Sequence, residues 1–544
     1  MIVRCVAVIV SNLKKQLGGK EVLQDVTFTL SENDKVGLVG VNGSGKSTLL
    51  KVLSGQLEVD SGSIKLGDKT IGYLKQEISY KYNDLTILEY IEQETGIAEL
   101  ETRLHALEDS LNDANMDEYS DVLNRFLVMD GYSFEDNLKE VLAGLKLHED
   151  LSSKIGTLSG GEKIKVLLAT LLLTNNDVLL LDEPTNNLDV EAIEWLESYL
   201  KNSNKEMIIV SHDEVFLNTI TSKIFELSDG SIKEYNLSYS DYLKQKELEY
   251  NQLKDDYERA QEQKDKLKKQ VQKAKEWANK GVNKKAHNDN DKLSNNYSKE
   301  RTNTGNISKL TKELEELKIP KFEEKRPIKV FFNFEDSKGN KDITLKNLVC
   351  GYETFHTPEI NLLIPFGSRV NITGGNGSGK TTLIKTILGQ IDPVTGEIRI
   401  GNDARIGYIS QNTLDEQTGD SIYTYLTKEK TDIDKAFVFV LLNKFSINYD
   451  DKDKPYSSLS PGERTRVNLA KLALDNINVL ILDEVTNHLD KEALDLVYEL
   501  VRDYGGTVIS ISHNRKYNEQ LNPDIDLDIK TGAVTQKHLT KHMS

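Results

Sequence analysis

The chain has 544 residues, of which 38% are hydrophobic and 29% charged, and its formal net charge is −18. That length is enough for two or three domains with separate cores. No run of about 18 apolar residues occurs, so no membrane-spanning helix is predicted. Cys5 and Cys350 are the only cysteines, which excludes a disulfide framework and a cysteine-based zinc site and suits a reducing, cytoplasmic location.

The N-terminal segment MIVRCVAVIV is apolar but lacks the basic start and small-residue cleavage site of a signal peptide, so it predicts a β-strand. A second strand, Val36–Val39, precedes Gly40-Val-Asn-Gly-Ser-Gly-Lys46-Ser47. This segment fits G-x-x-x-x-G-K-[ST], in which backbone N–H groups surround phosphates, the lysine reaches the β- and γ-phosphates, and the hydroxyl reaches Mg²⁺. A plain glycine-rich turn is the alternative, and the flanking strand and apolar helix start disfavour it.

Further motifs follow in the first half of the chain. They are Ile71-Gly-Tyr-Leu-Lys-Gln76, Leu158-Ser159-Gly-Gly161-Glu162-Lys163, Val178-Leu-Leu-Leu-Asp182-Glu183, Leu188-Asp189 and Ser211-His212. The continuous apolar run Val178–Leu181 predicts a buried parallel strand. Because open α/β sheets bind ligands at the carboxyl ends of their strands, Asp182 is predicted to hold Mg²⁺ and Glu183 to polarise the attacking water.

The same motifs return in the second half. They are Gly374-Gly-Asn-Gly-Ser-Gly-Lys380-Thr381, Gln411, Leu459-Ser460-Pro461-Gly462-Glu463, Val479-Leu-Ile-Leu-Asp483-Glu484, Leu489-Asp490 and Ser512-His513. Gln76 and Gln411 are 335 positions apart, whereas Ser159 and Ser460 are 301 apart, as are His212 and His513, so the first half carries 34 extra residues between Gln76 and Ser159. The helical pattern there predicts a small helical-hairpin insertion near residues 94–131. An ordinary lengthening of a helical subdomain is the alternative.

The segment between the halves, Ser238–Glu323, has a different composition. Apolar residues recur at three- and four-residue spacing, which predicts an antiparallel coiled-coil hairpin. The first seam contains Tyr250, Leu253, Tyr257, Ala260, Leu267, Val271, Ala274 and Ala278, and the second contains Ile307, Leu310, Leu314 and Leu317 before Pro320. A first helix of about 40 residues would reach roughly 60 Å.

The hairpin tip is basic. From Lys264 to Arg301 there are 12 Lys and Arg residues against 5 Asp and Glu residues, a net charge of +7, which leaves −25 on the rest of the chain. An acidic protein with one basic projection is suited to touch RNA only there. A charged spacer between domains is the alternative for a lone basic coiled coil.

The motif order in each half resembles the ATPase domain of the ATP-binding cassette (ABC) superfamily. Two such halves, a basic hairpin linker and an insertion in the first half resemble the ABC-F family over nearly the full length. The resemblance implies two cassettes that close on two ATP molecules, a protein that enters the ribosomal exit site, and a linker that contacts the peptidyl-site tRNA near the peptidyl-transferase centre. It also implies that the insertion, or arm, faces the ribosomal stalk.

The predicted fold class is therefore α/β, with two ABC-type P-loop ATPase domains joined by a long α-helical hairpin linker. The first cassette spans residues 1–237, with the arm at about 94–131. The linker spans 238–323, with its tip at about 280–292, and the second cassette spans 324–544. The expected ligands are ATP and Mg²⁺, and the expected partner is the ribosome through its RNA and the peptidyl-site tRNA. No membrane or DNA partner is expected, and the chain is expected to be a monomer whose cassettes form an intramolecular dimer.

The resemblance assigns site residues position by position. The predicted catalytic residues are Glu183, Glu484, His212 and His513. The predicted nucleotide-binding residues are Gly40, Asn42, Gly43, Gly45, Lys46, Ser47, Thr48, Gln76, Ser159, Gly161, Tyr352, Gly374, Asn376, Gly377, Gly379, Lys380, Thr381, Thr382, Gln411, Ser460 and Gly462. The predicted metal ligands are Ser47, Gln76, Asp182, Thr381, Gln411 and Asp483, and the predicted RNA contacts are Lys280, Lys284, Lys285, His287 and Lys292.

Some positions depart from the family pattern. Pro461 replaces a signature glycine, and Val485 stands where the first cassette has Pro184. Tyr352 is placed to stack on adenine, whereas the first cassette offers Leu17 there. The two sites are therefore expected to be competent but unequal.

Three alternatives for function stay open. Within the ribosomal hypothesis, protection against antibiotics competes with general translation control and stall rescue. The energy subunit of a transporter is a second class, although fused transport cassettes need only a short tether. A DNA-repair ABC ATPase is a third, although two cysteines cannot supply the zinc module that some of those proteins carry.

Overall fold

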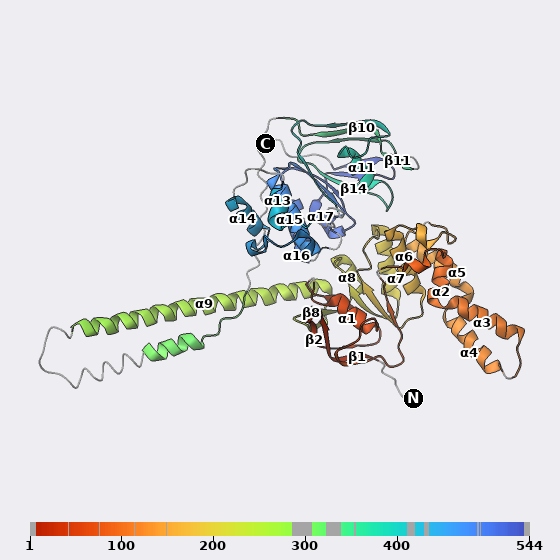
Figure 1. Cartoon of the computed structure of the whole chain (residues 1–544), viewed down its shortest axis with the longest axis horizontal. Helices are drawn as coiled ribbons and strands as arrows, with labels where there is room; N and C mark the ends of the chain where they lie inside the picture. The colour runs from red at the N-terminus through yellow and green to blue at the C-terminus, as the bar shows by residue number, and fades with distance from the viewer. Residues whose placement is uncertain are drawn as a thin grey trace. The chain divides into compact units, whose positions relative to one another are not determined.

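The computed structural model describes residues 7–41, 43–75, 77–113, 115–147, 149–284, 307–322, 339–352, 355–410, 419–428, 435–445, 447–486, 489 and 491–537. Two compact units are present: Met1–Tyr239 together with Ile328–Ser544, and Ser240–Pro327. The predicted α/β class is confirmed, and Figure 1 shows mixed helices and strands in both halves of the first unit.

The first cassette is built on a nine-stranded sheet with the strand order β4-β1-β2-β9-β8-β3-β7-β6-β5. Its strands are β1 (Val8–Leu17), β2 (Lys20–Leu30), β3 (Lys35–Val39), β4 (Ser61–Lys65), β5 (Ile71–Tyr73), β6 (Val178–Asp182), β7 (Glu206–Val210), β8 (Lys223–Ser228) and β9 (Ser231–Tyr235). Its helices are α1 (Lys46–Leu53), α2 (Ile87–Thr95), α3 (Ile97–Asp109), α4 (Met116–Val128), α5 (Phe134–Gly144), α6 (Gly160–Leu173), α7 (Val190–Asn202) and α8 (Glu214–Ile220).

The second cassette divides its strands among a three-stranded sheet (β13-β10-β15), a hairpin (β11-β12) and a six-stranded sheet (β16-β17-β18-β14-β19-β20). Its strands are β10 (Ile343–Val349), β11 (Gly351–Tyr352), β12 (Phe355–His356), β13 (Ile360–Ile364), β14 (Arg369–Thr373), β15 (Thr395–Ile400), β16 (Ile406–Ser410), β17 (Val479–Asp483), β18 (Thr507–Ile511), β19 (Ile525–Asp528) and β20 (Ala533–Gln536). Its helices are α11 (Lys380–Ile387), α13 (Ile422–Thr427), α14 (Lys435–Lys444), α15 (Pro461–Leu474), α16 (Lys491–Asp503) and α17 (Arg515–Leu521).

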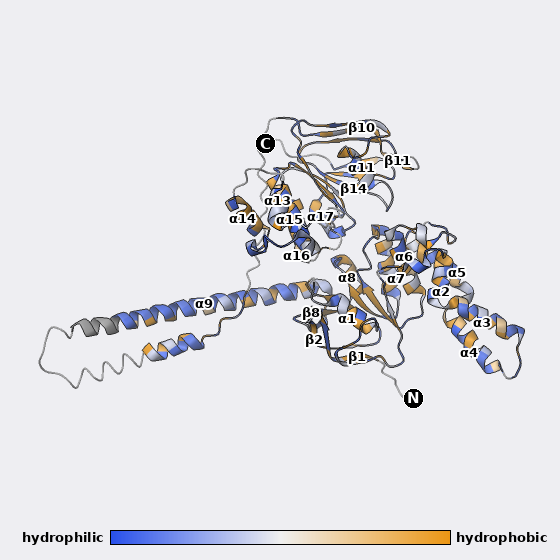
Figure 2. Cartoon of the chain, viewed as in Figure 1, coloured by the Kyte–Doolittle hydropathy of each residue, from blue (hydrophilic) through white to orange (hydrophobic). Residues whose placement is uncertain are grey.

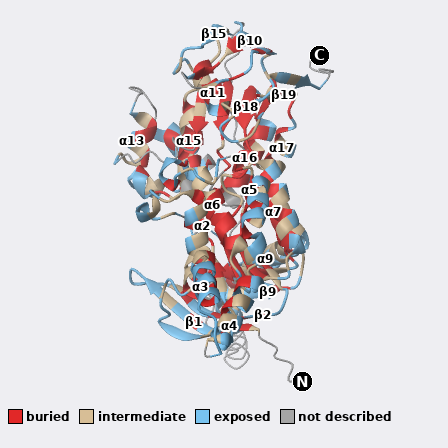
Figure 3. Cartoon of the chain, turned by 90° about the vertical axis from the view of Figure 1, so that its right-hand side faces the viewer, coloured by how far each residue is buried: buried red, intermediate tan, exposed pale blue. Residues whose placement is uncertain are grey.

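The central strands form the core of each cassette. β6 and β17 are buried at all five positions, as their continuous apolar sequences predict for parallel strands covered on both faces. β6 pairs in parallel with β5 and β7, and β17 pairs in parallel with β16 and β18. Figure 3 shows buried residues along strands such as β18 and along the covering helices α6, α15 and α16. The carboxyl ends of these strands therefore meet at one edge of each sheet.

Helices α3 and α4 lie in the interval where the arm is predicted, and Figure 1 shows them side by side. Leu100, Leu104 and Leu107 of α3 are buried, as are Val122 and Phe126 of α4, so the pair has its own apolar seam. An ion pair between Arg103 and Glu118 joins the two helices on their exposed side. Their assignment as an insertion relative to the second cassette stays a prediction.

The second unit is dominated by α9, a helix of 46 residues from Tyr239 to Lys284. At 1.5 Å rise per residue it is about 70 Å long. Residues 307–316 form a shorter helix, and Phe322 beyond it packs on Tyr250 and Tyr257 with ring centroids 5.3 and 5.4 Å apart. The chain therefore returns along α9 as a hairpin. Leu253, predicted on the seam, is 39% exposed, while its neighbour Lys254 is partly buried.

Helix α9 is polar along most of its length, as Figure 2 shows. Among the described ranges, no helix is both long enough and apolar enough to cross a bilayer.

Replacing Leu180, 1% exposed in the middle of β6, tests the central-strand core. We expect Leu180→Ala to lower the free energy of unfolding of the first cassette by about 2–5 kcal/mol, because it leaves a cavity between two parallel neighbours. The matched control Leu111→Ala removes the same atoms from a side chain that is 45% exposed and should cost less than about 1 kcal/mol. Urea unfolding followed by the fluorescence of Trp195, in a Trp277→Phe background, measures both, and equal midpoints would contradict this packing.

Candidate functional site

The two phosphate-binding loops hold their lysines in the same way. Lys46 and Lys380 are buried at the first position of α1 and α11, each after a glycine with left-handed backbone. Lys46 Nζ donates to the Gly40 carbonyl at 2.8 Å, and Lys380 Nζ donates to the Gly374 carbonyl, also at 2.8 Å. Burial lowers the pKa of Lys380, and the carboxylates of Glu484, Asp189 and Asp483 oppose that effect. Each ammonium group is thus kept inside its loop, where phosphate oxygens can replace the carbonyls.

An aromatic hairpin flanks the second loop. Tyr352 on β11 pairs with Phe355 on β12, and Tyr352 is 51% exposed. Gly379 has φ +97°, and a Cβ there would lie 2.8 Å from the Phe355 ring, so only glycine fits at that position. Phe355 was not predicted from the sequence, although an aromatic residue three positions after Tyr352 was a usable signal.

Asp182 and Asp483 end the central strands and suit a divalent cation. Burial raises the pKa of both carboxyls, and hydrogen bonds with Ser47 and Thr381 respectively act in the opposite direction. Among the described residues, Asp182 Oδ2 and Asp483 Oδ1 are buried without a hydrogen-bond partner. A hydroxyl beside a buried carboxylate with a spare oxygen is the hard-oxygen donor set that Mg²⁺ prefers, so these residues fit the predicted ion.

Two tyrosines beside these carboxylates were missed from the sequence. Tyr408 donates from its hydroxyl to Asp483 Oδ2 at 3.3 Å. Burial and the nearby carboxylate raise the pKa of Tyr73 and of Tyr408 to about 12, so both phenols stay protonated at neutral pH. The recurrence of Ile-Gly-Tyr before Gln76 and Gln411 was the available signal.

Glu183 and Glu484 follow the central strands in an unusual conformation. Their φ angles are 52° and 51°, the left-handed region that costs a non-glycine residue about 1–2 kcal/mol. A hydrogen bond from each backbone N–H to the neighbouring strand, at Val210 and Ile511, fixes the turn. Outliers of this kind concentrate at functional sites.

Each of these glutamates faces the histidine predicted to act with it. His212 Nε2 lies 3.4 Å from Glu183 Oε1, and His513 Nε2 lies 3.8 Å from Glu484 Oε1. The structure thus brings each predicted glutamate and histidine together.

The signature serines are helix N-caps. Ser159 and Glu162 form a reciprocal capping box at the start of α6, and Ser460 and Glu463 do the same at α15. The ψ angles of the two serines are 164° and 159°, so Pro461 leaves the cap geometry unchanged. Proline suits the first helical position because its missing N–H has no intrahelical partner there.

Residues of both cassettes line one cavity of about 520 Å³. The second cassette contributes Tyr352, the loop from Asn376 to Thr382, Glu484 and His513, and the first contributes Gly161, Glu183, Asn187 and His212. The amide of Asn376 donates to the Asn187 carbonyl at 2.8 Å. The second phosphate loop is therefore covered by the first cassette, including the signature glycine predicted for this site.

The remaining predicted residues divide into three groups. Asn42, Gln76, Gln411, Lys285, His287 and Lys292 lie outside the described residues. Lys280 and Lys284 belong to the last turns of α9. Gly40, Gly43, Gly45, Ser47, Thr48, Gly374, Gly377, Thr381, Thr382, Ser460 and Gly462 lie in the phosphate loops, at the starts of α1 and α11, or at the start of α15. Asn187 approaches the second phosphate loop and stands where the second cassette has His488, but it was not predicted as a site residue.

Two phosphate loops, signature helix caps and strand-end carboxylates define a twin-cassette ABC ATPase. Models described as ABC transporter match residues 23–186, 358–487 and 225–325. The chain belongs to the ABC-F family and is an ATP-hydrolysing protein, and the predicted architecture of two ABC cassettes joined by a helical linker is confirmed.

Relatives from bacteria and plants cover most of the chain. The ATP-binding protein Uup of Haemophilus influenzae is 33% identical over 91% of this chain and 74% of its own length. ABC transporter F family member 2 of Arabidopsis thaliana is 31% identical, over 94% and 74%. A solved structure of the archaeal ribosome recycling factor aABCE1, in complex with the ribosomal stalk protein aP1, has the same fold, with a TM-score of 0.54 and 19% identity over 95% of this chain and 87% of that chain.

The buried His513 predicts a pH dependence of stability. Burial, aided by Lys380 and Lys165 and opposed by Asp189, lowers its pKa from 6.5 to about 4. The folded state therefore binds fewer protons than the unfolded state, so this contribution is present above pH 6.5 and is lost as pH falls toward 4. Between pH 8 and pH 5 the wild type should lose about 2 kcal/mol more than His513→Asn. Chemical unfolding of both proteins at the two pH values measures this difference, and parallel pH curves would contradict a buried neutral histidine.

Proposed function

We propose that this ABC-F ATPase is a translation factor that binds the ribosomal exit site and uses its linker to act on the peptidyl-site tRNA and the peptidyl-transferase centre. Protection of the ribosome against antibiotics is the role proposed first, and general translation control with stall rescue is the alternative. The observation that carries the proposal is the distribution of charge along α9.

Charge is segregated along that single helix. From Tyr239 to Gln263 it carries 4 Lys and Arg residues against 7 Asp and Glu residues, whereas from Lys264 to Lys284 it carries 8 against 2. The net charge changes from −3 to +6 with distance along the helix. A spacer has no need of this gradient, whereas a projection that meets RNA at its distal end gains from it, because phosphates attract the tip and repel the root.

The cassettes supply the motor. In the second site, Lys380, Thr381, Gln411, Asp483, Glu484 and His513 act with Ser159 and Gly161 of the first cassette. In the first site, Lys46, Ser47, Gln76, Asp182, Glu183 and His212 act with Ser460 and Gly462. The observed cavity and the Asn376–Asn187 hydrogen bond support the composite arrangement of the second site.

ATP stabilises the closed state because each γ-phosphate contacts both cassettes, and hydrolysis removes that contact. Glu183 and Glu484 orient the attacking water, while His212 and His513 contact the γ-phosphate. Mg²⁺, held by Ser47 and Asp182 or by Thr381 and Asp483 with the two glutamines, would neutralise phosphate charge.

Blocking hydrolysis at both sites tests the ribosomal partner. The double variant Glu183→Gln, Glu484→Gln should bind ATP, hydrolyse it about 100-fold more slowly or worse, and accumulate in the closed state on ribosomes. Co-sedimentation with 70S particles in ATP measures the accumulation, with ADP as the control. Absence of the double variant from the ribosomal pellet in ATP would contradict the proposed partner, and its recovery in membrane fractions would favour the transporter alternative.

Removing positive charge from the hairpin tip tests the proposed contact of the linker with RNA. Alanine at Lys284, Lys285 and Lys292 should reduce function without reducing ATPase activity by more than about twofold, because the substitutions remove phosphate contacts and leave the cassettes intact. The readout is growth with lincosamides, pleuromutilins, streptogramin A, macrolides, phenicols and oxazolidinones, in cells with and without the gene.

The proximal substitutions Lys244→Ala, Lys246→Ala and Lys254→Ala are the matched control. Full protection against the antibiotics by the tip variant would contradict the proposed RNA contact and would favour the hairpin as a spacer between domains. Absence of drug protection by the wild type, together with ribosome binding, would favour general translation control.

A further inference from the structure

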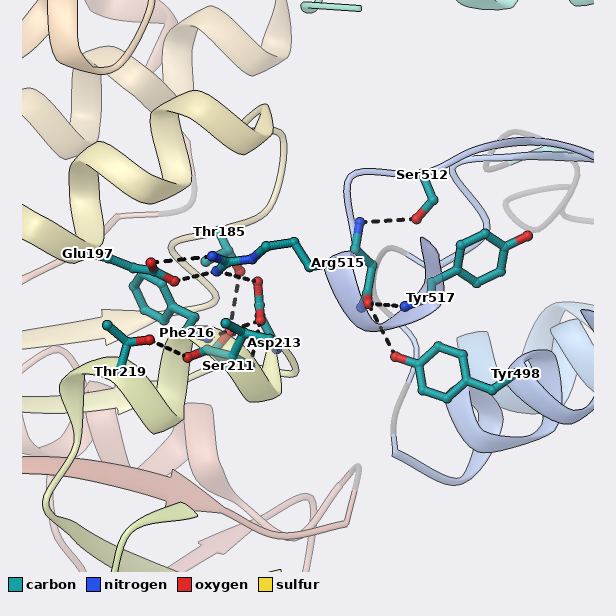
Figure 4. Close-up of polar contacts among 12 residues, drawn as sticks. Thr185, Glu197, Ser211, Asp213, Phe216, Thr219, Tyr498, Ser512, Arg515 and Tyr517 are labelled. Carbon is teal, nitrogen blue, oxygen red and sulfur yellow. Dashed lines mark hydrogen bonds and ion pairs between the residues drawn. The ribbon is translucent and has the colours of Figure 1, made fainter. Parts of the chain in front are cut away.

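Arg515 joins the two cassettes beside their histidine turns. It is the first residue of α17, and its guanidinium forms two hydrogen bonds with the carboxylate of Glu197 on α7, one of them 3.3 Å between Nη1 and Oε2. Its Nη2 also lies 3.6 Å from Asp213 Oδ2. Figure 4 shows Arg515 extending from the second cassette to both first-cassette carboxylates.

Asp213 belongs to the turn that carries His212. Its Oδ1 caps α8 by accepting from the backbone N–H groups of Val215 and Phe216 at 2.9 and 3.0 Å. Its own N–H donates to Ser211 Oγ at 3.1 Å, and that hydroxyl lies 3.3 Å from Thr185 Oγ1, two residues after Glu183. A displacement of the Asp213 carboxylate is therefore transmitted to the backbone on both sides of His212.

The second cassette repeats this turn without the carboxylate. Asn514 takes the place of Asp213 as helix cap, its N–H donates to Ser512 Oγ at 3.1 Å, and Ser512 Oγ lies 3.0 Å from Thr486 Oγ1. Arg515 directly follows this turn. Arg515 therefore connects two sets of polar contacts. One set joins Thr486, Ser512 and Asn514 in the second cassette, and the other joins Asp213, Ser211 and Thr185 in the first. Both histidine turns contribute to the lining of the shared cavity.

The repeat offset of 301 positions shows that the residues equivalent to Arg515 and Glu197 cannot form the same ion pair with the cassettes exchanged. Arg515 corresponds to Glu214, and its partner Glu197 corresponds to Tyr498. The Tyr498 hydroxyl donates within its own cassette, to Asn514 Oδ1 at 3.3 Å. Glu214 instead pairs with Lys516 at 2.7 Å. Within the part of the chain that the structure describes, a guanidinium from the opposite cassette therefore reaches the histidine turn of the first site, at Asp213, and not that of the second.

The contact of Arg515 with Glu197 and Asp213 is largely removed from water. Side-chain exposure is 10% for Glu197, 11% for Asp213 and 21% for Arg515. A guanidinium that forms two hydrogen bonds with one carboxylate is geometrically selective, and removing it leaves two buried carboxylates close together without their cation. Substitution of Arg515 therefore acts directly on the position of Asp213.

We propose that Arg515 is a positioning residue for ATP hydrolysis at the first site, where it holds the His212 turn from the opposite cassette through Asp213. The proposal rests on the proposed role of His212 in that site. It makes the first site sensitive to the position of α17, because the contact reaches the Asp213 carboxylate of the His212 turn. In the second cassette the equivalent cap, Asn514, instead accepts from the Tyr498 hydroxyl of its own cassette.

ATP hydrolysis by the full-length chain without ribosomes tests the proposal, so the result does not depend on the proposed ribosomal partner. The Glu484→Gln background reports the first site, and the Glu183→Gln background reports the second. In the first background Arg515→Met should lower kcat about tenfold or more, with KM for ATP changed less than about threefold, because misplacement of a reacting group affects the chemical step. In the second background kcat should change less than about twofold.

Two variants accompany it. Arg515→Lys keeps the charge and should restore part of the lost kcat. Lys516→Met removes the neighbouring cross-cassette ion pair with Glu214 and should leave the ratio of the two site activities unchanged.

An equal fall at both sites, or the same effect from Lys516→Met, would overturn the proposal in favour of a general role in cassette association. His212→Ala is the check on the premise. If it leaves first-site kcat unchanged, the assigned role of His212 fails and the inference fails with it. If it lowers kcat while Arg515→Met does not, the inference alone fails.

Discussion

The parallel register of the buried central strands is the constraint on which both ATP sites depend. Asp182 is level with Val210 on the neighbouring strand, and Asp483 is level with Ile511. His212 lies two residues after Val210, and His513 lies two residues after Ile511. This register therefore brings each glutamate and its histidine together. A shift by one residue would turn the carboxylates to the opposite face of the sheet and separate the pair. The apolar identity of β6 and β17 is therefore required for the geometry of both proposed sites as much as for stability.

The sequence predicted those features that short segments of chain encode. The phosphate loops, the strand-end carboxylates and the signature caps each depend on fewer than about ten consecutive residues whose chemistry dictates the local fold. Contacts between distant segments had no such signal. Tyr408 and Asp483 are 75 positions apart, and Arg515 and Glu197 are 318 apart. The repeated Ile-Gly-Tyr marks Tyr408 itself, but nothing local marks its contact with Asp483 or the pair of Arg515 and Glu197, so only the folded chain shows these contacts.

Helical periodicity gave an intermediate result. The hairpin seam was predicted at Tyr250 and Tyr257, which pack on Phe322, but also at Leu253, which is 39% exposed. Lys254 beside it is also only partly buried, with 44% of its side chain exposed, so partial burial on this part of α9 is not confined to the predicted apolar positions. The alkyl part of a lysine can cover apolar surface at such a position while its ammonium stays in water.

The two cassettes share a backbone pattern and differ in the chemistry placed on it. At the position of the first helical residue after the histidine turn, one has Glu214 and the other Arg515. Two copies of the first cassette would set like charges together, as would two copies of the second. Pairing of a first with a second cassette joins opposite charges, at Arg515 with Glu197 and at Lys516 with Glu214, which favours pairing of unlike cassettes over pairing of like ones.

The reciprocal helix caps at Ser159 and Ser460 affect how a match to the LSGGE motif is interpreted. Much of the LSGGE signature matches the pattern of a helix N-cap: a hydroxyl at the cap, an acid three residues later, and small or rigid residues between them. In both copies one carboxylate oxygen of the glutamate accepts a hydrogen bond from the backbone N–H of its own serine. A search for this string therefore detects a particular way of starting a helix, and the proposed phosphate contact would make use of that helix start.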